Sequence, residues 1–349
     1  RFDVHEWRLP LLLMNYVNFG RTGVQVSPLT LGCMMFGAKT GLDESCRIID
    51  RALDAGLNFI DTADVYSRGV SEEFTGEALK RNGRRDHVFL ATKAHGVMDD
   101  SDPNMRGNTR RHLIAACEAS LRRLQTDHID LYQIHRPQPD VPIDETLRAL
   151  DDLVRAGKVR YLGTSTFAAW QVVESLWCAK ELHLNRFVSE QPPYNLLDRR
   201  IERELLPACR TYGLATLPWS PLAGGLLTGK YRAGQPIPAG SRFADKDNSP
   251  FNARRWTDAS LALIERLVPL AAAKAVTLSQ FALAWVLHQP GVTSAIVGPR
   301  TLDQLEDNLR ALDVSFTAEE LKRIDAIAPP GDYTSPYYEA DFGPHPHRW

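Results

Sequence analysis

The stretch Leu57-Asn58-Phe59-Ile60-Asp61-Thr62-Ala63-Asp64-Val65-Tyr66 starts as an apolar run of strand length and ends in two carboxylates and a phenol. Strands that are buried on both faces, as in parallel sheets, appear in a sequence as continuous apolar runs. In α/β proteins, polar side chains at the C-terminal ends of such strands are the ones that carry chemistry. The stretch therefore predicts a buried strand over 57–60 with candidate site residues directly after it.

The same alternation of apolar runs and helical segments continues along the chain. Apolar runs of strand length begin near Leu29, Leu57, Val88, Ile129, Val159, Phe187, Leu214 and Thr293. Eight strand–helix units without a change in composition predict a (β/α)8 TIM barrel of the α/β class. A doubly wound sheet is the alternative, but it favours fewer strands and a G-x-G-x-x-G turn, and the sequence contains no G-x-G.

Four segments lie outside this repeat. Residues 16–19 and 24–26 flank a glycine-bounded turn and predict an N-terminal β-hairpin. Residues 221–257, after the seventh strand, form a long Gly- and Pro-rich connection, which is typical of a functional lid or of disorder. The aromatic-rich tail from about residue 330 either is unstructured or packs over the barrel mouth. We interpret residues 1–13 as an upstream or cloning-derived extension, and residues 14–349 as a single domain.

The composition argues against several classes of function. The chain has 349 residues and a formal net charge of −2, which disfavours nucleic acid or an anionic membrane as the main partner. The five cysteines are scattered without a C-x-x-C pair, which is typical of reduced thiols and not of a disulfide framework or a zinc site. No apolar run approaches the ~20 residues that span a bilayer. We therefore expect a cytoplasmic protein without a metal site, and the oligomeric state stays open.

Polar side chains follow three consecutive strands of the predicted barrel. Asp61, Lys93 and His135 come at the ends of the second, third and fourth strands, and Tyr66 lies five residues beyond Asp61. Taken singly, an Asp or Lys at a strand end is usually half of a structural ion pair. Because the C-terminal ends of barrel strands converge on one mouth, we expect all four side chains to meet there.

This set of residues favours chemistry on a carbonyl group. A phenol has a reference pKa of ~10 and is a poor acid at neutral pH, but a neighbouring ammonium stabilises the phenolate. Lys93 can supply that ammonium, Asp61 can keep it charged, and His135 can hydrogen-bond a substrate oxygen. The set provides a general acid for an oxygen that acquires negative charge, and it lacks a nucleophile with an adjacent base. Hydride delivery to a carbonyl fits best, and it requires a nicotinamide.

The ordered set of motifs resembles the aldo-keto reductase family, in particular its branch of bacterial reductases and potassium-channel β subunits. The stretch 56–63 with Tyr66 matches the first family signature. Thr92-Lys93, His135 and the turn at 163–165 match the next three. The similarity extends over residues 16–327.

The resemblance implies reversible, NADPH-dependent reduction of an aldehyde or ketone to the alcohol. In that reading Tyr66 is the proton donor, Lys93 and Asp61 tune it, and His135 orients a small-molecule carbonyl substrate. The sequence does not identify that substrate.

The resemblance also implies a set of cofactor contacts. Ser165 and Gln191 correspond to contacts with the nicotinamide carboxamide, and Trp219 corresponds to the aromatic surface under the nicotinamide ring. The other implied contacts lie along the pyrophosphate (Ser220, Leu222, Gly224 and Lys230) and around the adenosine (Gly298, Arg300, Gln304, Asp307 and Asn308). Arg300 would bind a 2′-phosphate, since a guanidinium matches phosphate oxygens bidentately, and this favours NADPH over NADH.

The sequence departs from the family pattern at two positions and leaves two other functions open. Thr166 stands where many members carry asparagine, and Asp307 stands where glutamate is more usual. The alternatives are an NADPH-binding regulatory subunit and a barrel aldolase with Lys93 as a Schiff-base nucleophile. The stretch 224–231 nearly fits a phosphate-binding loop, but Tyr231 replaces the Ser or Thr that would bind magnesium, which excludes nucleotide hydrolysis.

Overall fold

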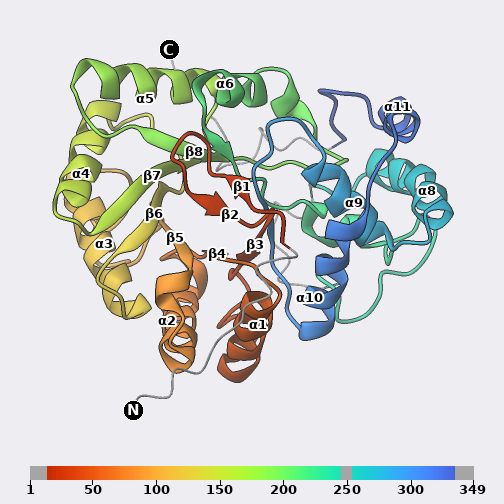
Figure 1. Cartoon of the computed structure of the whole chain (residues 1–349), viewed down its shortest axis with the longest axis horizontal. Coiled ribbons are helices and arrows are strands. Elements are labelled where there is room, and N and C mark those ends of the chain that lie inside the picture. The colour runs from red at the N-terminus through yellow and green to blue at the C-terminus, as the bar shows by residue number, and fades with distance from the viewer. Residues whose placement is uncertain (1–13, 245–253, 335–349) are drawn as a thin grey trace.

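Eight parallel strands form one curved sheet in the structure, a computed structural model that describes residues 14–244 and 254–334. The strands are β3 (Leu29–Gly32), β4 (Phe59–Asp61), β5 (Phe89–Ala94), β6 (Ile129–Ile134), β7 (Val159–Ser165), β8 (Phe187–Gln191), β9 (Ala215–Thr216) and β10 (Ala295–Val297). Their order is β10-β3-β4-β5-β6-β7-β8-β9. The two edge strands meet, because the Thr216 carbonyl accepts from the Thr293 N–H at 2.9 Å and the Pro218 carbonyl accepts from the Ile296 N–H at 2.9 Å. The predicted (β/α)8 barrel is confirmed (Figure 1).

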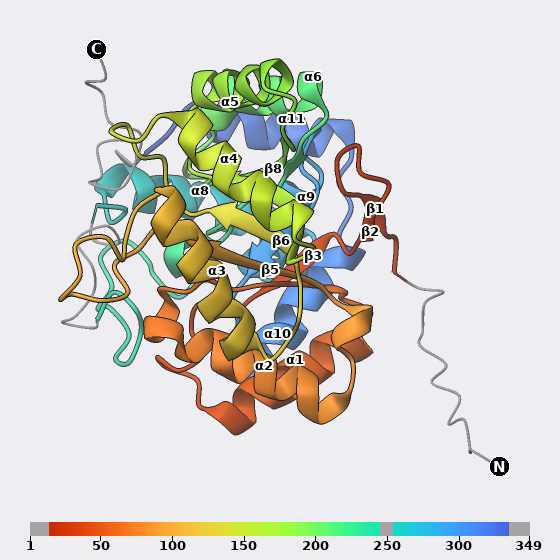
Figure 2. The ribbon, with the colours of Figure 1, turned by 90° about the vertical axis from the view of Figure 1, so that its left-hand side faces the viewer.

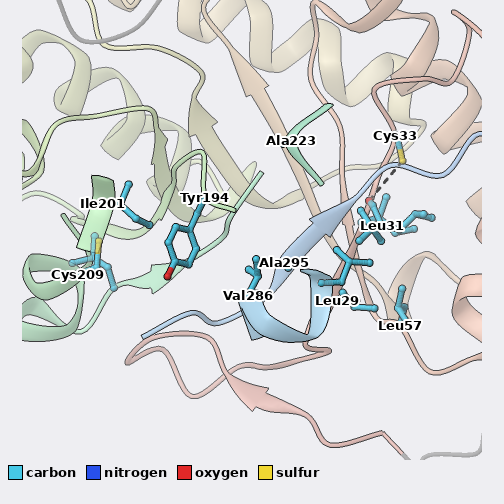
Figure 3. Packing of buried hydrophobic residues seen from close by; sticks show 14 of the residues in the cluster. Leu29, Leu31, Cys33, Leu57, Tyr194, Ile201, Cys209, Ala223, Val286 and Ala295 are labelled. Carbon is cyan, nitrogen blue, oxygen red and sulfur yellow. Dashed lines mark hydrogen bonds between the residues drawn. The ribbon is translucent and has the colours of Figure 1, made fainter. Parts of the chain in front are cut away.

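Helices surround the sheet and cover its outer face (Figure 1, Figure 2). They are α1 (Leu42–Asp54), α2 (Val70–Asn82), α3 (Arg110–Leu124), α4 (Ile143–Arg155), α5 (Ala169–Glu181), α6 (Leu205–Tyr212), α8 (Asp258–Ala273), α9 (Leu278–Leu287), α10 (Leu302–Leu309) and α11 (Ala318–Ile327). The larger core lies between these helices and the strands. Figure 3 shows part of it, with Leu29 of β3, Val286 of α9 and Ala295 of β10 among the buried side chains.

The predicted hairpin is confirmed, and it closes one end of the barrel (Figure 2). Strands β1 (Val17–Asn18) and β2 (Gln25–Val26) pair in antiparallel fashion. Phe19, in the turn, lies 5.8 Å from the ring of Phe59 and 4.9 Å from that of Phe89, between ring centroids. Because these two rings stand at the N-terminal ends of β4 and β5, the hairpin seals the end opposite the predicted site.

Aromatic side chains pack together within the described part of the connection after β9. It contains the 3-10 helix η4 (Ala223–Thr228), and the ring of Tyr231 packs on those of Phe243 and Trp256 with centroids 5.0 and 5.5 Å away. Leu226, Leu227 and Tyr231 belong to the buried core that surrounds the strands, so the predicted connection at 221–257 packs against the barrel where it is described. Residues 245–253 lie outside the described residues.

The beginning of the C-terminal tail packs on the connection between β8 and α6. The Thr334 N–H donates to the Leu197 carbonyl at 2.9 Å, and the Arg199 N–H donates to the Asp332 carbonyl at 2.8 Å. Residues 335–349 and the segment 1–13, on which two of our sequence predictions fall, lie outside the described residues.

The five cysteines are all free thiols in the structure. Over residues 14–244 and 254–334, no single helix has the length and apolar character that a membrane crossing requires.

The packing of Phe19 on Phe59 and Phe89 predicts a large loss of stability for Phe19→Ala. Removing a fully buried ring that contacts two others should lower the free energy of unfolding by about 3–5 kcal/mol. Urea unfolding followed by circular dichroism would measure it. The control Ile237→Ala removes a half-exposed side chain and should change the free energy of unfolding by less than ~1 kcal/mol. Equal effects of the two substitutions would contradict a sealing role for Phe19.

Candidate functional site

The structure brings the four predicted site residues together at the C-terminal end of the barrel. Asp61 ends β4, Lys93 lies in β5, and His135 directly follows β6. The Lys93 Nζ lies 2.5 Å from Asp61 Oδ1 and 5.1 Å from the ring centroid of Tyr66. The rings of Tyr66 and His135 are 5.6 Å apart and nearly perpendicular.

A strained turn holds Tyr66 over this ion pair. Tyr66 begins the 3-10 helix η1 (Tyr66–Gly69), in which Ser67 and Arg68 have φ angles of 50° and 52°. The Ser67 hydroxyl donates to the Phe36 carbonyl at 3.2 Å and ties the turn to the loop after β3. Positive φ at two consecutive non-glycine residues costs free energy, and such strain clusters at functional sites.

Lys93 is fully buried and remains charged. Its ammonium donates to Asp61 Oδ1 and, at 2.7 Å, to the Thr62 carbonyl. Burial lowers the pKa of Lys93, but attraction to Asp61 and Tyr66 outweighs burial, so the pKa lies above its ordinary value. A Schiff-base lysine needs the opposite, a lowered pKa. This argues against the aldolase alternative.

His135 is neutral at physiological pH. Burial, and then the positive charges of Arg136 and Lys93, hold the pKa of His135 well below its ordinary value. A neutral imidazole carries one N–H donor and one acceptor, so it can donate a hydrogen bond to an oxygen without carrying a charge.

Gln133, which is absent from the predicted set of site residues, contacts Asp61 directly. Its side chain is buried, and its Nε2 donates to Asp61 Oδ2 at 3.1 Å. The available signal was the two-residue period of a strand: Ile129 and Leu131 precede Gln133 on the same face, so a polar side chain there points into the barrel.

Asp64, the second carboxylate of the opening stretch, is tied to β5 through its backbone, because its N–H donates to the Lys93 carbonyl at 3.1 Å. Its side chain does not line the cavity that begins at Asp61 and Tyr66. It is fully buried, and neither of its oxygens has a hydrogen-bond partner among the described residues. Burial, and then the negative charge of Glu72, raise the pKa of Asp64 to about 8.

A cavity of about 530 Å³ runs from Asp61 and Tyr66 along the rim of the barrel to α10. It is lined by most of the residues for which the sequence predicts cofactor contacts: Gln191, Trp219, Ser220, Leu222, Gly224, Lys230, Gly298, Arg300, Gln304, Asp307 and Asn308. Ser165 lies beside this cavity, and its hydroxyl donates to the Gln191 carbonyl at 2.9 Å. Lys93 and His135 are not among the lining residues.

Three cations line the outer half of this cavity. They are Lys230, Arg242 and Arg300. Burial, and then repulsion from Arg300, lower the pKa of Arg242, so the two guanidinium groups are close together. Within the described residues, neither arginine has a carboxylate partner, and the buried hydroxyl of Ser241 forms no hydrogen bond. Such a group of donors suits an anion with several oxygens.

Two of the predicted adenosine contacts already have protein partners. Asp307 Oδ1 accepts from Gln280 Nε2 at 2.6 Å, and Gln304 Oε1 accepts from the Arg300 N–H at 2.8 Å. Asp307 therefore also holds the start of α9 (Leu278–Leu287).

Thr166, the departure noted in the turn after β7, has a φ of 65°. This angle is strained for a β-branched residue and is better tolerated by asparagine. The Thr166 hydroxyl accepts from Arg136 Nη1 at 2.8 Å, and the same nitrogen donates to the His135 carbonyl at 2.7 Å. The threonine thereby connects the turn after β7 to the loop that carries His135.

The chain belongs to the aldo/keto reductase family, whose model matches residues 28–329. The resemblance given by the motifs is thus confirmed.

Individual relatives cover nearly the whole chain. An uncharacterized oxidoreductase, YrpG, of Bacillus subtilis is 41% identical over 93% of this chain and 99% of its own length. A probable voltage-gated potassium channel subunit beta of Oryza sativa is 39% identical over 90% of this chain and 96% of its own length. The versiconal hemiacetal acetate reductase of Aspergillus parasiticus is 34% identical over 89% of this chain and 96% of its own length. The similarity therefore includes both oxidoreductases and channel subunits.

The buried carboxyl of Asp64 predicts a pH-dependent cost in stability. The pKa of Asp64 is about 8 in the folded protein, whereas it is close to the ordinary aspartate value of 3.8 in the unfolded chain. The contribution of Asp64 to the free energy of unfolding is therefore fully present below pH 3.8 and is lost as the pH rises towards 8. Asp64→Asn should remove this loss. The difference in free energy of unfolding between the variant and the wild type should therefore shift in favour of the variant by ~1 kcal/mol or more from pH 5 to pH 8.

Urea unfolding at the two pH values would measure this difference. Glu174→Gln, on an exposed position of α5, is the matched control and should leave the pH dependence unchanged. An Asp64→Asn variant with the wild-type pH dependence would show that Asp64 is ionised in the folded protein.

Proposed function

We propose that the protein reduces an aldehyde or ketone to the alcohol with NADPH, and oxidises the alcohol in the reverse direction. The observation that carries this proposal is the position of the buried, charged Lys93 beneath the ring of Tyr66, 5.1 Å from its centroid. Family membership and the oxidoreductase relatives support the same reaction class.

In the proposed mechanism, the Tyr66 hydroxyl gives its proton to the substrate oxygen. The Lys93 ammonium stabilises the phenolate that remains, and Asp61 holds Lys93 in place. His135, being neutral, donates a hydrogen bond to the same substrate oxygen and fixes its orientation. When bound, the reduced nicotinamide supplies the hydride that the carbonyl carbon needs.

The cavity residues fit a phosphate-bearing dinucleotide. Gly224 and Gly225 line the cavity with φ angles of 70° and 106°, so the backbone there can approach a ligand without side chains in between. Ser165 and Gln191 would hold the carboxamide end, Trp219 would lie under the nicotinamide ring, and the wall from Ser220 to Lys230 would follow the pyrophosphate. Gly298, Gln304, Asp307 and Asn308 would surround the adenosine, and Arg300 would bind the 2′-phosphate.

We also propose that residues 14–349 form a single domain in the cytoplasm. Buried side chains from β3 to α11 belong to one continuous core, which supports the single domain. The free state of all five cysteines supports a reducing compartment.

A second function is an NADPH-binding regulatory subunit with weak or no physiological turnover. The 39% identity to a probable potassium channel subunit beta favours it. The presence of all four groups around the substrate position favours turnover. The two functions differ in one measurable quantity, the rate of NADPH oxidation with a carbonyl substrate.

Tyr66→Phe is the central test of the reductase proposal. The wild type should oxidise NADPH with at least one member of a panel of aromatic aldehydes, dicarbonyls and ketosugars. The variant should lose at least ~100-fold in kcat, because general-acid catalysis contributes on this scale, while its Kd for NADPH changes by less than ~3-fold.

Absorbance at 340 nm gives the rate, and quenching of tryptophan fluorescence gives the Kd. Tight NADPH binding without wild-type turnover on the whole panel would favour the regulatory function. A near-normal kcat in Tyr66→Phe would show that another group donates the proton.

Arg300→Ala tests the assignment of the 2′-phosphate site. Losing a bidentate charged contact should raise the Kd for NADPH by at least ~10-fold and leave the Kd for NADH nearly unchanged. The preference for NADPH should therefore fall. An unchanged preference would move the phosphate contact to Arg242 or Lys230, which line the same part of the cavity.

A further inference from the structure

Gln133 lies at the centre of the site although the proposed mechanism gives it no role. It occupies β6 in register with Lys93 of β5 on one side and Gly163 of β7 on the other. Its side chain is fully buried inside the barrel. A buried amide must find partners for its N–H and C=O groups, and those of Gln133 are found across the barrel and not on neighbouring strands.

The partners of Gln133 are the side chains of Asp61 and Gln191. Gln133 Nε2 donates to Asp61 Oδ2 at 3.1 Å, and Gln133 Oε1 accepts from Gln191 Nε2 at 3.2 Å. Gln191 Nε2 also donates to Asp61 Oδ2 at 2.9 Å. The three residues come from β4, β6 and β8, which are alternate strands, and in this type of barrel alternate strands contribute side chains to the same layer.

Donor and acceptor chemistry fixes the orientation of both amides. An ionised carboxylate only accepts hydrogen bonds, so each glutamine must turn its NH2 group towards Asp61. Gln191 then uses both amide hydrogens, one on Asp61 and one on Gln133. Its carbonyl oxygen is left for the cavity, which Gln191 lines.

The neighbouring strand leaves room for this arrangement. Gly163 has no side chain, and a Cβ at this position would lie 3.0 Å from Cγ of Gln133 and 2.4 Å from the hydroxyl oxygen of Ser189. A contact of 2.4 Å essentially never occurs at a real Cβ, and one of 3.0 Å is tighter than most. A larger residue at this position of β7 would therefore force Ser189 to move and would press on Gln133.

We propose that Gln133 is a positioning residue for the reduction proposed above. It fixes Asp61 and Gln191 relative to one another. The ion pair beneath Tyr66 and the Gln191 amide, which is expected to contact the nicotinamide, therefore keep a constant distance and orientation. Asp61 is held by Lys93 on one oxygen and by two amides on the other. Gln133 acts through Asp61 and touches no reacting atom; this role rests on the proposed function.

Gln133→Met is the first test, since methionine has a similar length and forms no comparable hydrogen bonds. Loss of a hydrogen bond to a buried charge should lower kcat by about 10-fold, while the Kd for NADPH rises by less than ~3-fold because Gln191 keeps its bond to Asp61. Tyr132→Phe is the matched control: it removes a buried hydrogen bond to the Leu113 carbonyl from the preceding residue of β6 and should leave kcat unchanged.

The Asp61→Asn background separates positioning from a general structural effect. If Gln133 acts through Asp61, Gln133→Met should lower the residual kcat of Asp61→Asn by less than ~2-fold. An equal loss in both backgrounds, or a kcat of Gln133→Met within ~2-fold of the wild type, would overturn the inference. Absence of wild-type turnover would instead overturn the proposed function, and the positioning role with it.

Gln133→Glu gives a second readout that does not depend on the stability of Gln133→Met. A protonated carboxyl can replace the amide donor, whereas an ionised one repels Asp61, and proximity to Asp61 raises the pKa of the introduced group. The kcat of this variant, relative to the wild type, should fall by at least ~10-fold as the pH rises from about 5.5 to about 8.5. A pH profile parallel to that of the wild type would overturn the inference.

Discussion

The ion pair between Lys93 and Asp61 is the interaction on which the rest of the site depends. Both side chains are almost completely excluded from solvent, and removing two charges from water costs several kcal/mol for each ion. The barrel compensates with fixed dipoles: the Thr62 carbonyl accepts from Lys93, and the amides of Gln133 and Gln191 donate to Asp61. The charges are thus stable inside the protein only because several strands supply partners at the same level.

The two ends of the barrel interior differ in polarity for this reason. Near the hairpin, the rings of Phe19, Phe59 and Phe89 fill the space with apolar side chains, which need no partners. At the opposite end, the strand termini supply polar groups whose partners come from other strands. The apolar end provides the packing that holds the strands in register, and the polar end uses that register to place Asp61, Lys93 and Gln133 within hydrogen-bond distance.

The sequence was sufficient to predict the eight strands and the group of four residues. Each strand is a short apolar run, and Asp61, Lys93 and His135 stand where such runs end. Gln133 was not predicted as a site residue because it lies one residue before the end of β6. Its role depends on how β4, β6 and β8 align around the barrel. That alignment is a property of the closed sheet, and no local pattern encodes it.

The connection after β9 was harder to predict for a related reason. Ser241 and Arg242 reach the cavity from a segment without helical or strand periodicity, so only tertiary packing shows that they lie near Arg300. The burial of Asp64 was equally hidden, because a carboxylate in a loop ordinarily lies in solvent. In both cases the outcome depends on which residues from other parts of the chain pack around the side chain.

The pairing of β10 with β3 has a consequence for the synthesis of the protein. Thr30 and Ser294, whose hydroxyl oxygens are 2.6 Å apart, are separated by 264 positions in the chain. A nascent chain therefore carries two open sheet edges, β3 and β9, until β10 leaves the ribosome, and open edges pair readily with other chains. The closed ring that leaves no open edge among these eight strands forms only after nearly 300 residues have been synthesised.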